Sequence, residues 1–339
     1  MFLHELAQVK TIVVHGNCPD GVASAILLHD VLPQAEIKFM QHGQDAYKAL
    51  VPEPGYLFCD IVPYVTTKEV TTDGVIKRIN DLEAIKPWVD AGTLVLDHHK
   101  GVQDVVEAFG PKRSHFGDEK TEPGVCGAVL AFRHVWSLIH EVMDATDTVA
   151  IEEEKRAEQF ATLAGIRDTW LNKHPAWQAA CAQAEMLRFY PIEHWLNFKD
   201  PFSTGAFEVW QERCAIGSLL VERNERSTLK TIESAYRFTS ARGTKVIAFH
   251  NTKASSDVAE VLGSEVDLVI GFAYIAEEGV PKMLLSTRSH AGFDCLAFSK
   301  FHGGNGHTKA AGFNRVVVSH DLNPYEMIKQ LVLWYESSL

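Results

Sequence analysis

The chain has 339 residues, of which 46% are hydrophobic and 22% are charged, so a disordered protein is excluded and two domains can be accommodated. The 32 basic and 44 acidic residues give a formal net charge of −12. Proteins that coat long nucleic acids are usually basic, so this charge favours a short anionic substrate that is bound locally. A cluster of carboxylates that holds divalent cations would also contribute to the negative charge.

Six cysteines are scattered along the chain without a CxxC pair, which is typical of reduced thiols in the cytoplasm. No apolar run approaches the roughly 20 residues of a membrane-spanning helix. The N-terminus lacks the basic start and apolar core of a signal peptide. We therefore expect a cytoplasmic protein without membrane contacts, and the sequence leaves its oligomeric state open.

Short β-branched runs alternate with helical segments in the first half of the chain. This alternation predicts an α/β fold with a doubly wound, mostly parallel sheet. The expected strands are 11–14, 37–40, 56–59 and 93–96, and the expected helices are 21–32, 76–89, 125–139 and 150–165, with further helical sequence to about residue 198.

A segment that contains Pro, Gly and Ser, 197–205, is the best candidate for a linker. We expect a catalytic domain over 1–196, a linker and connecting helix over 197–237, and a smaller α/β domain over 238–339, with a cleft between the two domains. In the second domain, the expected strands are 245–249, 268–274, 283–286 and 316–318, and the expected helices are 258–262 and one at the C-terminus.

Side chains that are typical metal ligands follow the expected strands and the long helix. Because the carboxyl ends of parallel strands meet at one edge of a sheet, we expect these groups to lie together, where a cation offsets their repulsion. Such a ligand set suits Mn²⁺ or Mg²⁺ and tolerates Fe or Co. Taken singly, the residues have simpler explanations, such as a turn for Asp20 or a helix cap for Asp60. The residues are His15, Asp20, Asp60, Asp97, His98, His99 and Asp168.

A glycine-rich segment with the sequence GGNGH, 303–307, precedes TKAAGF. Glycines let backbone N–H groups approach an anion, and the helix-compatible residues 308–311 predict a helix N-terminus directed at a phosphate. An arginine in the preceding strand is suited to bind phosphate as a bidentate fork. The alternatives are an ordinary loop and a surface arginine. The candidate substrate-binding residues are Arg288, Gly303, Gly304, Gly306 and His307.

The sequence LVLDHHKG, 94–101, resembles the signature of the DHH phosphoesterase superfamily. The chain order of the seven ligand residues resembles the four N-terminal motifs of that superfamily, and 284–313 is similar to its C-terminal DHH-associated domain. The resemblance covers most of the chain. Related members include RecJ-type exonucleases, nano-RNases, pAp phosphatases and cyclic-dinucleotide phosphodiesterases.

The resemblance implies a centre with one or two Mn²⁺ ions, with Mg²⁺, Fe, Co or Zn as alternatives. It implies that Asp60 bridges the two ions. Asp20, His98 and Asp168 would complete one site, and His15 would belong to the other.

The resemblance also implies a catalytic group around the DHH sequence. Asp97 would orient an imidazole, as metal-bound histidines usually require, and His99 would face the substrate phosphate; Asp60 and His98 complete this group. One position departs from the superfamily, because Cys18 stands where many relatives have an aspartate. A thiolate ligand would favour Zn or Fe over Mn. Alternatively, Cys18 does not bind and the first site is weak or empty.

We therefore expect a metal-dependent phosphoesterase that hydrolyses phosphodiester or phosphomonoester bonds by attack of a metal-bound hydroxide. Short single-stranded oligonucleotides or nucleotides are the substrates that fit the acidic net charge, as for an exonuclease or nano-RNase. A cyclic-dinucleotide phosphodiesterase or a pAp-type phosphatase is the alternative. A third hypothesis, a nucleotide-binding protein with weakened catalysis, follows from Cys18.

Overall fold

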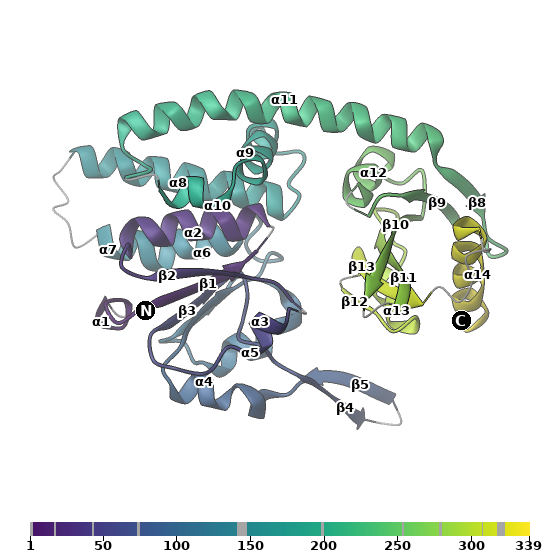
Figure 1. Cartoon of the computed structure of the whole chain (residues 1–339), viewed down its shortest axis with the longest axis horizontal. Coiled ribbons are helices and arrows are strands. Elements are labelled where there is room, and N and C mark those ends of the chain that lie inside the picture. Colours follow the sequence, from purple (N-terminus) through teal and green to yellow (C-terminus); the bar gives the residue numbers. More distant parts are fainter. Residues whose placement is uncertain are drawn as a thin grey trace. The chain divides into compact units, whose positions relative to one another are not determined.

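The fold is that of a computed structural model, which describes residues 3–16, 18–42, 44–72, 75–140, 148–197, 200–252, 254–277, 280–306, 308–316 and 323–339. The chain forms two compact units, Met1–Val221 and Glu222–Leu339. Their boundary lies within the long helix α11 (Thr204–Ser234), which is labelled in Figure 1. Among the described residues, no helix combines the length and the apolar character that are needed to cross a membrane.

Parallel strands form the central sheet of the first unit. They are β1 (Thr11–His15), β2 (Glu36–Met40), β3 (Tyr56–Cys59), β6 (Leu94–Asp97) and β7 (Ser114–Phe116). Their order in the sheet is β2-β1-β3-β6-β7. The chain therefore continues from β1 to β2 on one side of β1, and then crosses to β3 on the other side of β1. The connections thus run in opposite directions from the point between β1 and β3. In open α/β sheets, ligands bind at such a point, beyond the carboxyl ends of the strands.

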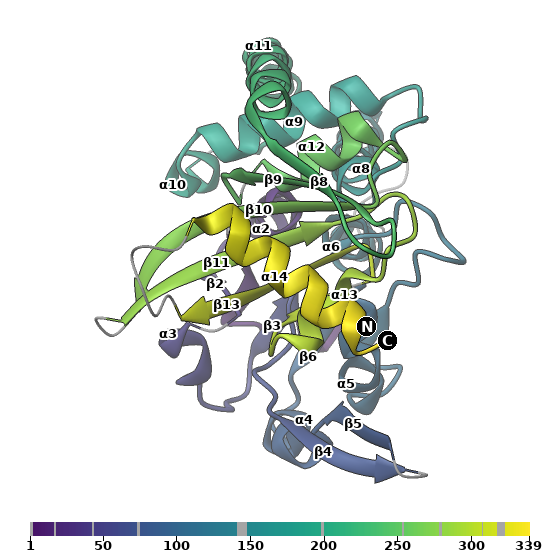
Figure 2. The same ribbon diagram turned by 90° about the vertical axis from the view of Figure 1, so that its right-hand side faces the viewer.

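Helices cover both faces of this sheet, as Figures 1 and 2 show. The helical segments are α1 (Leu3–Leu6), α2 (Pro19–Val31), α3 (Asp45–Lys48), η1 (Leu82–Ile85), α4 (Lys86–Asp90), η2 (Lys100–Val102), α5 (Gln103–Ala108), α6 (Gly127–Ala131), η3 (Phe132–Trp136), α7 (Ser137–His140), α8 (Thr148–Asp168), α9 (Trp177–Phe189) and α10 (Ile192–Leu196). Successive strand residues face opposite sides, so Ile12 and Val14 pack in the core with α2, α6 and α8, whereas Val13 packs with α4 and α5. The doubly wound α/β fold is thereby confirmed for this unit.

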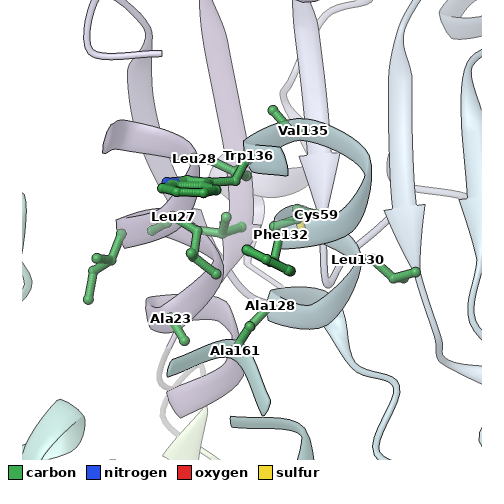
Figure 3. Close-up of a cluster of buried hydrophobic side chains, with 14 of the residues drawn as sticks. Ala23, Leu27, Leu28, Cys59, Ala128, Leu130, Phe132, Val135, Trp136 and Ala161 are labelled. Carbon is green, nitrogen blue, oxygen red and sulfur yellow. The ribbon is translucent and has the colours of Figure 1, made fainter. Parts of the chain in front are cut away.

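Small residues let three helices approach closely in the larger core of the first unit. Figure 3 shows Ala23 of α2, Ala128 of α6 and Ala161 of α8 in this core. The approach is closest between α8 and the segment before α6, because a β-carbon on Gly165 would lie 1.9 Å from the carbonyl oxygen of Gly124. This packing holds the beginning of α6 against the end of α8.

The helix expected over 76–89 is wrong for residues 76–80, whereas 82–89 is helical. The structure has β5 (Val75–Asn80) in antiparallel pairing with β4 (Thr67–Thr72), and helical turns follow only from Leu82. Val, Ile and Thr are favoured in strands, and Asp-Gly between two β-branched runs is a typical hairpin sequence. Apolar spacing alone did not reveal this pairing. The short strand β7 was also not predicted.

A mixed sheet forms the second unit. Its strands are β8 (Tyr236–Thr239), β9 (Lys245–His250), β10 (Leu268–Glu277), β11 (Val280–Arg288), β12 (Asn305–Gly306) and β13 (Ala310–Val316), and its other helices are α12 (Ser255–Leu262), α13 (Cys295–Phe301) and α14 (Pro324–Ser337). The strand order is β12-β13-β11-β10-β9-β8, in which only β9 and β10 pair in parallel among the described strands. Helix α12 packs on one face, and α13 and α14 pack on the other. The expected smaller α/β domain is confirmed, although β8 replaces the end of the helix expected to reach residue 237, and residues 317 and 318 of an expected strand lie outside the described residues.

A half-buried carboxyl near the end of α2 predicts a pH dependence of stability. Trp136 donates its indole N–H to the Asp30 carboxylate at 2.9 Å, and burial raises the pKa of Asp30 to about 6. The folded protein therefore keeps this proton to a higher pH than the unfolded chain, so the free energy of unfolding falls as the pH rises from about 4 to about 6. Asp30→Asn keeps an oxygen acceptor and removes the charge. We expect it to raise the free energy of unfolding at pH 7 by about 1–2 kcal/mol.

Urea unfolding between pH 4 and pH 8, with a chelator present, measures this effect. Asp90→Asn is the matched control, because Asp90 also lies at the end of a helix but is exposed. Equal pH profiles for wild type and Asp30→Asn would contradict the assignment.

Candidate metal centre

Five elements of the first unit bring acidic and histidine side chains to the carboxyl edge of the sheet. His15 is the last residue of β1, Asp97 is the last residue of β6, and Asp60 directly follows β3. The first turn of α2 contributes Asp20, and Asp168 is the last residue of α8. The sequence predicted this grouping from the strand ends, and the structure places these side chains together with His98 and His99.

His98 lies at the centre of the group and is buried. Its Nε2 atom lies 3.3 Å from Oδ1 of Asp60, and 3.7 Å from Oδ2 of Asp20. The same atom lies 3.5 Å from Oδ2 of Asp168. On the other side of the ring, Nδ1 lies 3.1 Å from Oε1 of Glu119. Glu119 thus orients the imidazole so that Nε2 faces the three aspartates, and nothing in the spacing of the sequence pointed to it.

Asp60 faces histidines on both sides. Its backbone has φ +60°, a conformation that Asp and Asn tolerate better than most residues. Oδ2 lies 3.7 Å from Nδ1 of His15, and Oδ1 lies 3.7 Å from Nδ1 of His99. Oδ2 is buried and has no hydrogen-bond partner among the described residues. A buried carboxylate oxygen without a donor is costly, so this atom is placed as a ligand atom would be.

Asp20 connects the group to the beginning of α6. Its two oxygens accept hydrogen bonds from the backbone N–H groups of Gly127 and Ala128, at 2.7 and 2.8 Å. The free N–H groups at a helix N-terminus favour a negative charge there. Asp20 therefore has a structural role in addition to the ligand role expected from the sequence.

Three aspartates lie close together in this group, and their surroundings shift the pKa of each carboxyl. Burial raises the pKa of Asp20 well above its usual value, with further contributions from Asp60 and Asp168. Burial also raises the pKa of Asp168. Burial has the same effect on Asp60, but the neighbouring imidazoles of His15 and His98 outweigh it and hold its pKa well below the usual range. A divalent cation is the group that would satisfy all three carboxylates in one place.

The outer part of the group is partly open to solvent. The side chains of His15, Asp168 and His99 are 27%, 26% and 35% exposed, whereas Asp60 and Asp97 are buried. Asp97 holds His99, because its Oδ1 accepts the backbone N–H of His99 and lies 2.8 Å from the ring Nδ1. Asp97 therefore fixes the ring of His99 with its other side toward solvent.

His42 lies beside the group and was also not predicted. Its ring centroid is 5.7 Å from that of His15 and 5.7 Å from that of Tyr47. Burial lowers the pKa of His42, and the neighbouring His15 and His99 lower it further. His42 stands two residues after β2, so the argument from strand ends that found the other residues could also have found it.

The candidate substrate-binding residues lie in the second unit. Arg288 donates to Ser256 at 3.0 Å, to Ser286 at 3.0 Å and to the backbone carbonyl of Thr287 at 2.8 Å. In the part of the chain that the structure describes, no carboxylate forms an ion pair with this guanidinium. Burial lowers its pKa. A half-buried arginine that is held by neutral acceptors is suited to bind an anion.

The helix N-terminus expected over 308–311 is wrong, because Ala310 and Ala311 belong to strand β13. The glycines have a structural explanation: β-carbons on Gly304 and Gly306 would lie within 2.1 and 2.4 Å of atoms of β13. Gly303 has a φ of +85°, and no atom lies within 4 Å of the position that a β-carbon on it would take. His307 lies outside the described residues. The phosphate role of this segment stays a prediction.

No family model matches the chain, and no curated protein sequence does. Solved structures do match. The DHH domain of a protein described as a member of a family of ribosomal proteins has a TM-score of 0.56 at 12% identity, over 98% of this chain and 87% of that one. The exonuclease RecJ bound to manganese has a TM-score of 0.54 at 14% identity, over 98% and 92% of the two chains. The chain has the DHH-domain fold.

A pGpG-specific phosphodiesterase from Vibrio cholerae is also similar, with a TM-score of 0.42 at 14% identity over 96% of this chain and 99% of that one. The DHH-domain fold agrees with the resemblance found in the sequence LVLDHHKG. In this fold, the order of the strands brings the aspartates and histidines of this chain to one edge of the sheet.

The ligand atoms of this DHH fold fit divalent cations. Three groups each offer three ligand atoms that lie within 4.8 Å of one another. Asp60 and His98 each belong to two of them. The groups are His15, Cys18 and Asp60; Asp60, His98 and His99; and Asp20, His98 and Asp168.

Metal binding should stabilise the folded protein, since the carboxylates meet only after folding. With free Mn²⁺ at about 100 times its dissociation constant, the expected gain is about 2.7 kcal/mol. We expect the melting temperature of the Mn²⁺-saturated protein to exceed that of the chelator-treated protein by roughly 5–10 °C. His98→Ala should abolish the difference, because Nε2 is the atom shared by the three aspartates. Equal melting temperatures for wild type with and without Mn²⁺ would argue against a metal centre.

Proposed function

We propose that this chain is a metal-dependent phosphoesterase that hydrolyses phosphodiester or phosphomonoester bonds of short oligonucleotides or nucleotides. The observation that supports this best is Asp60, a buried carboxylate with one oxygen toward His98 and His99 and the other toward His15. A carboxylate between two groups of ligands is the arrangement that holds two cations near each other. The DHH-domain fold that the chain shares with RecJ is consistent with the proposal.

Each part of the site has a task in this reaction. Bound cations would supply a water of lowered pKa and neutralise the phosphoryl oxygens. Asp60, Asp20 and Asp168 hold the charge that such cations need, and Glu119 fixes the ring of His98. No side chain of the group suggests a covalent intermediate, so the reaction is an in-line attack of water on phosphorus.

His99 is the candidate for direct contact with the substrate. Oδ1 of Asp97 lies 2.8 Å from both the backbone nitrogen and the ring Nδ1 of His99. These contacts fix the ring at the exposed side of the group. A ring that is oriented in this way needs little reordering when a phosphate binds. We assign His99 to a phosphoryl oxygen and Asp97 to the orientation of that imidazole.

A panel of substrates tests the function. Labelled oligonucleotides of two to about ten nucleotides, pAp and cyclic dinucleotides are incubated with the Mn²⁺-loaded protein. We expect hydrolysis of the shortest linear substrates to be fastest, because the net charge of −12 opposes long polyanions. If only pAp or only cyclic dinucleotides are cleaved, that compound replaces short oligonucleotides as the proposed substrate. If none of these compounds is cleaved, the proposed activity is contradicted.

Arg288 should contribute to substrate affinity without affecting the metals. Hydrogen bonds to charged groups are worth about 1.5–3 kcal/mol, so we expect Arg288→Ala to raise KM roughly 10–100-fold. Metal content, measured by elemental analysis, should remain that of the wild type. Arg242→Ala, at an exposed position of the same unit, is the control. An unchanged KM would remove Arg288 from the substrate contacts.

A further inference from the structure

We propose that Cys18 is a metal ligand, so that the two halves of the centre prefer different cations. The half with His15, Cys18 and Asp60 would take a thiophilic cation of the Zn²⁺, Fe²⁺ or Co²⁺ class. The half with Asp20, His98 and Asp168 would take a hard cation such as Mn²⁺. This inference rests on the metal centre of the proposed function and specifies which ions it binds.

The positions of the three donors support the assignment. The ligand atoms of His15, Cys18 and Asp60 lie within 4.8 Å of one another, and the distance from His15 Nδ1 to Asp60 Oδ2 is 3.7 Å. A tetrahedral cation with bonds of about 2.0–2.3 Å separates its ligands by roughly 3.3–3.8 Å. Small side-chain rotations therefore suffice to close the group around one ion.

A second observation points to a ligand at the same place. Oδ2 of Asp60, the oxygen that faces His15, is one of the buried atoms without a hydrogen-bond partner among the described residues. Asp60 is 1% exposed, so water cannot freely solvate that oxygen. A cation bound by Cys18 and His15 would satisfy it.

Cys18 differs from the other two cysteines near the centre. Cys59 is buried, and its Sγ donates to the backbone carbonyl of Gly127 at 3.4 Å. Cys126 is buried and directs its thiol at Asp20. Cys18 is only partly buried and lies at the N-terminus of the 13-residue helix α2, where the helix dipole favours an anion. Of these three cysteines, Cys18 is therefore the one that a cation can reach. Burial and the neighbouring carboxylates of Asp60 and Asp168 raise the pKa of its thiol, so its thiolate needs a bound cation.

The donor chemistry then separates the two halves. One imidazole nitrogen, one sulfur and one carboxylate oxygen form a soft to intermediate set, which selects Zn²⁺ or Fe²⁺ over Mn²⁺. Two carboxylates and one imidazole form a harder set, which suits Mn²⁺ or Mg²⁺. When the cation binds Cys18, the thiol proton is released to solvent, so affinity for the soft ion rises with pH.

Cobalt(II) provides a spectroscopic test that does not depend on activity. Metal-stripped wild type, Cys18→Ser and Cys18→Asp are titrated with Co²⁺ without oxygen. Cys214→Ser is the matched control, because this half-buried cysteine lies on α11, away from the centre. We expect wild type and Cys214→Ser to develop a near-ultraviolet sulfur-to-cobalt charge-transfer band, and both Cys18 variants to bind Co²⁺ without that band.

Competition between metals gives a second readout. We expect Cys18→Ser to weaken Zn²⁺ binding by at least about 10–100-fold, a loss already typical of residues that only support a ligand. Cys18→Asp should shift the bound metal from Zn²⁺ toward Mn²⁺ when both are supplied equally. The same charge-transfer band in wild type and both Cys18 variants, or no band in any of them despite bound Co²⁺, would overturn the role of Cys18 alone. No Co²⁺ binding in any protein would overturn the metal centre of the proposed function as well.

Discussion

Asp60→Asn should lower the rate of phosphoester hydrolysis by about a thousandfold or more. Removing one partner from a buried charged group costs about 3–5 kcal/mol, and about 4 kcal/mol corresponds to a thousandfold change in rate. Asp60 contacts three histidines through its two oxygens, so its loss affects both halves of the centre at once. Asparagine keeps the size of the side chain and tolerates the φ of +60° at this position, so the fold should persist.

The experiment measures kcat and bound metal for wild type, Asp60→Asn and Asp45→Asn. Asp45 is an exposed aspartate at the beginning of α3, so its variant controls for the loss of one negative charge. Asp60→Asn should bind less metal than either of the others. Near-normal turnover of Asp60→Asn with its full metal content would remove the bridging role.

Gly127→Ala should disturb the centre from the side of the protein core. A β-carbon at this position would lie 2.6 Å from Cβ of Asp60 and 2.9 Å from Oδ2 of Asp20. Both aspartates are buried, and Asp20 is fixed by the N–H groups of α6, so neither can move away freely. Insertion of one methyl group into a packed core costs about 1–3 kcal/mol. We expect such a loss in the free energy of unfolding, together with a metal affinity reduced at least tenfold, as for other changes that displace ligands.

Gly205→Ala is the matched control for this substitution. Gly205 lies near the beginning of α11, and nothing lies within 4 Å of its β-carbon position. Alanine is favoured over glycine in helices by about 1 kcal/mol, so the control should be as stable as wild type or slightly more stable. Wild-type stability and metal affinity in Gly127→Ala would show that the packing around Asp20 and Asp60 is looser than the structure indicates.

The grouping of the acidic and histidine side chains was largely predictable from the sequence, because the ends of parallel strands bring them together. His15, Asp60 and Asp97 each stand at or directly after an apolar β-branched run, and such strand ends meet at one edge of the sheet. The helix patterns around Asp20 and Asp168 then placed two further carboxylates near that edge. Local periodicity was sufficient here, since each of these side chains is adjacent to an element that the sequence shows clearly.

Other parts of the site depend on contacts that no local pattern reveals. Glu119 lies in a segment without regular structure and reaches His98 only because β7 and α6 bring that segment over the sheet. The support of Asp20 by Gly127 comes from a residue more than a hundred positions later. In the second unit, Ala310 and Ala311 favour a helix locally, but pairing with β11 makes them a strand. The hairpin of β4 and β5 has the same explanation, because pairing between the two strands outweighs the helical pattern of the local sequence.

Turnover during metal titration tests the central claim most directly. Metal-stripped protein is mixed with increasing Mn²⁺, and hydrolysis of a labelled linear dinucleotide is measured at each step, alongside bound metal. The account predicts no hydrolysis without metal and a rate that rises with the occupancy of the centre, while Asp60→Asn stays about a thousandfold slower or more at every Mn²⁺ concentration. Undiminished hydrolysis by the stripped protein, or no hydrolysis by a fully loaded wild type, would contradict it.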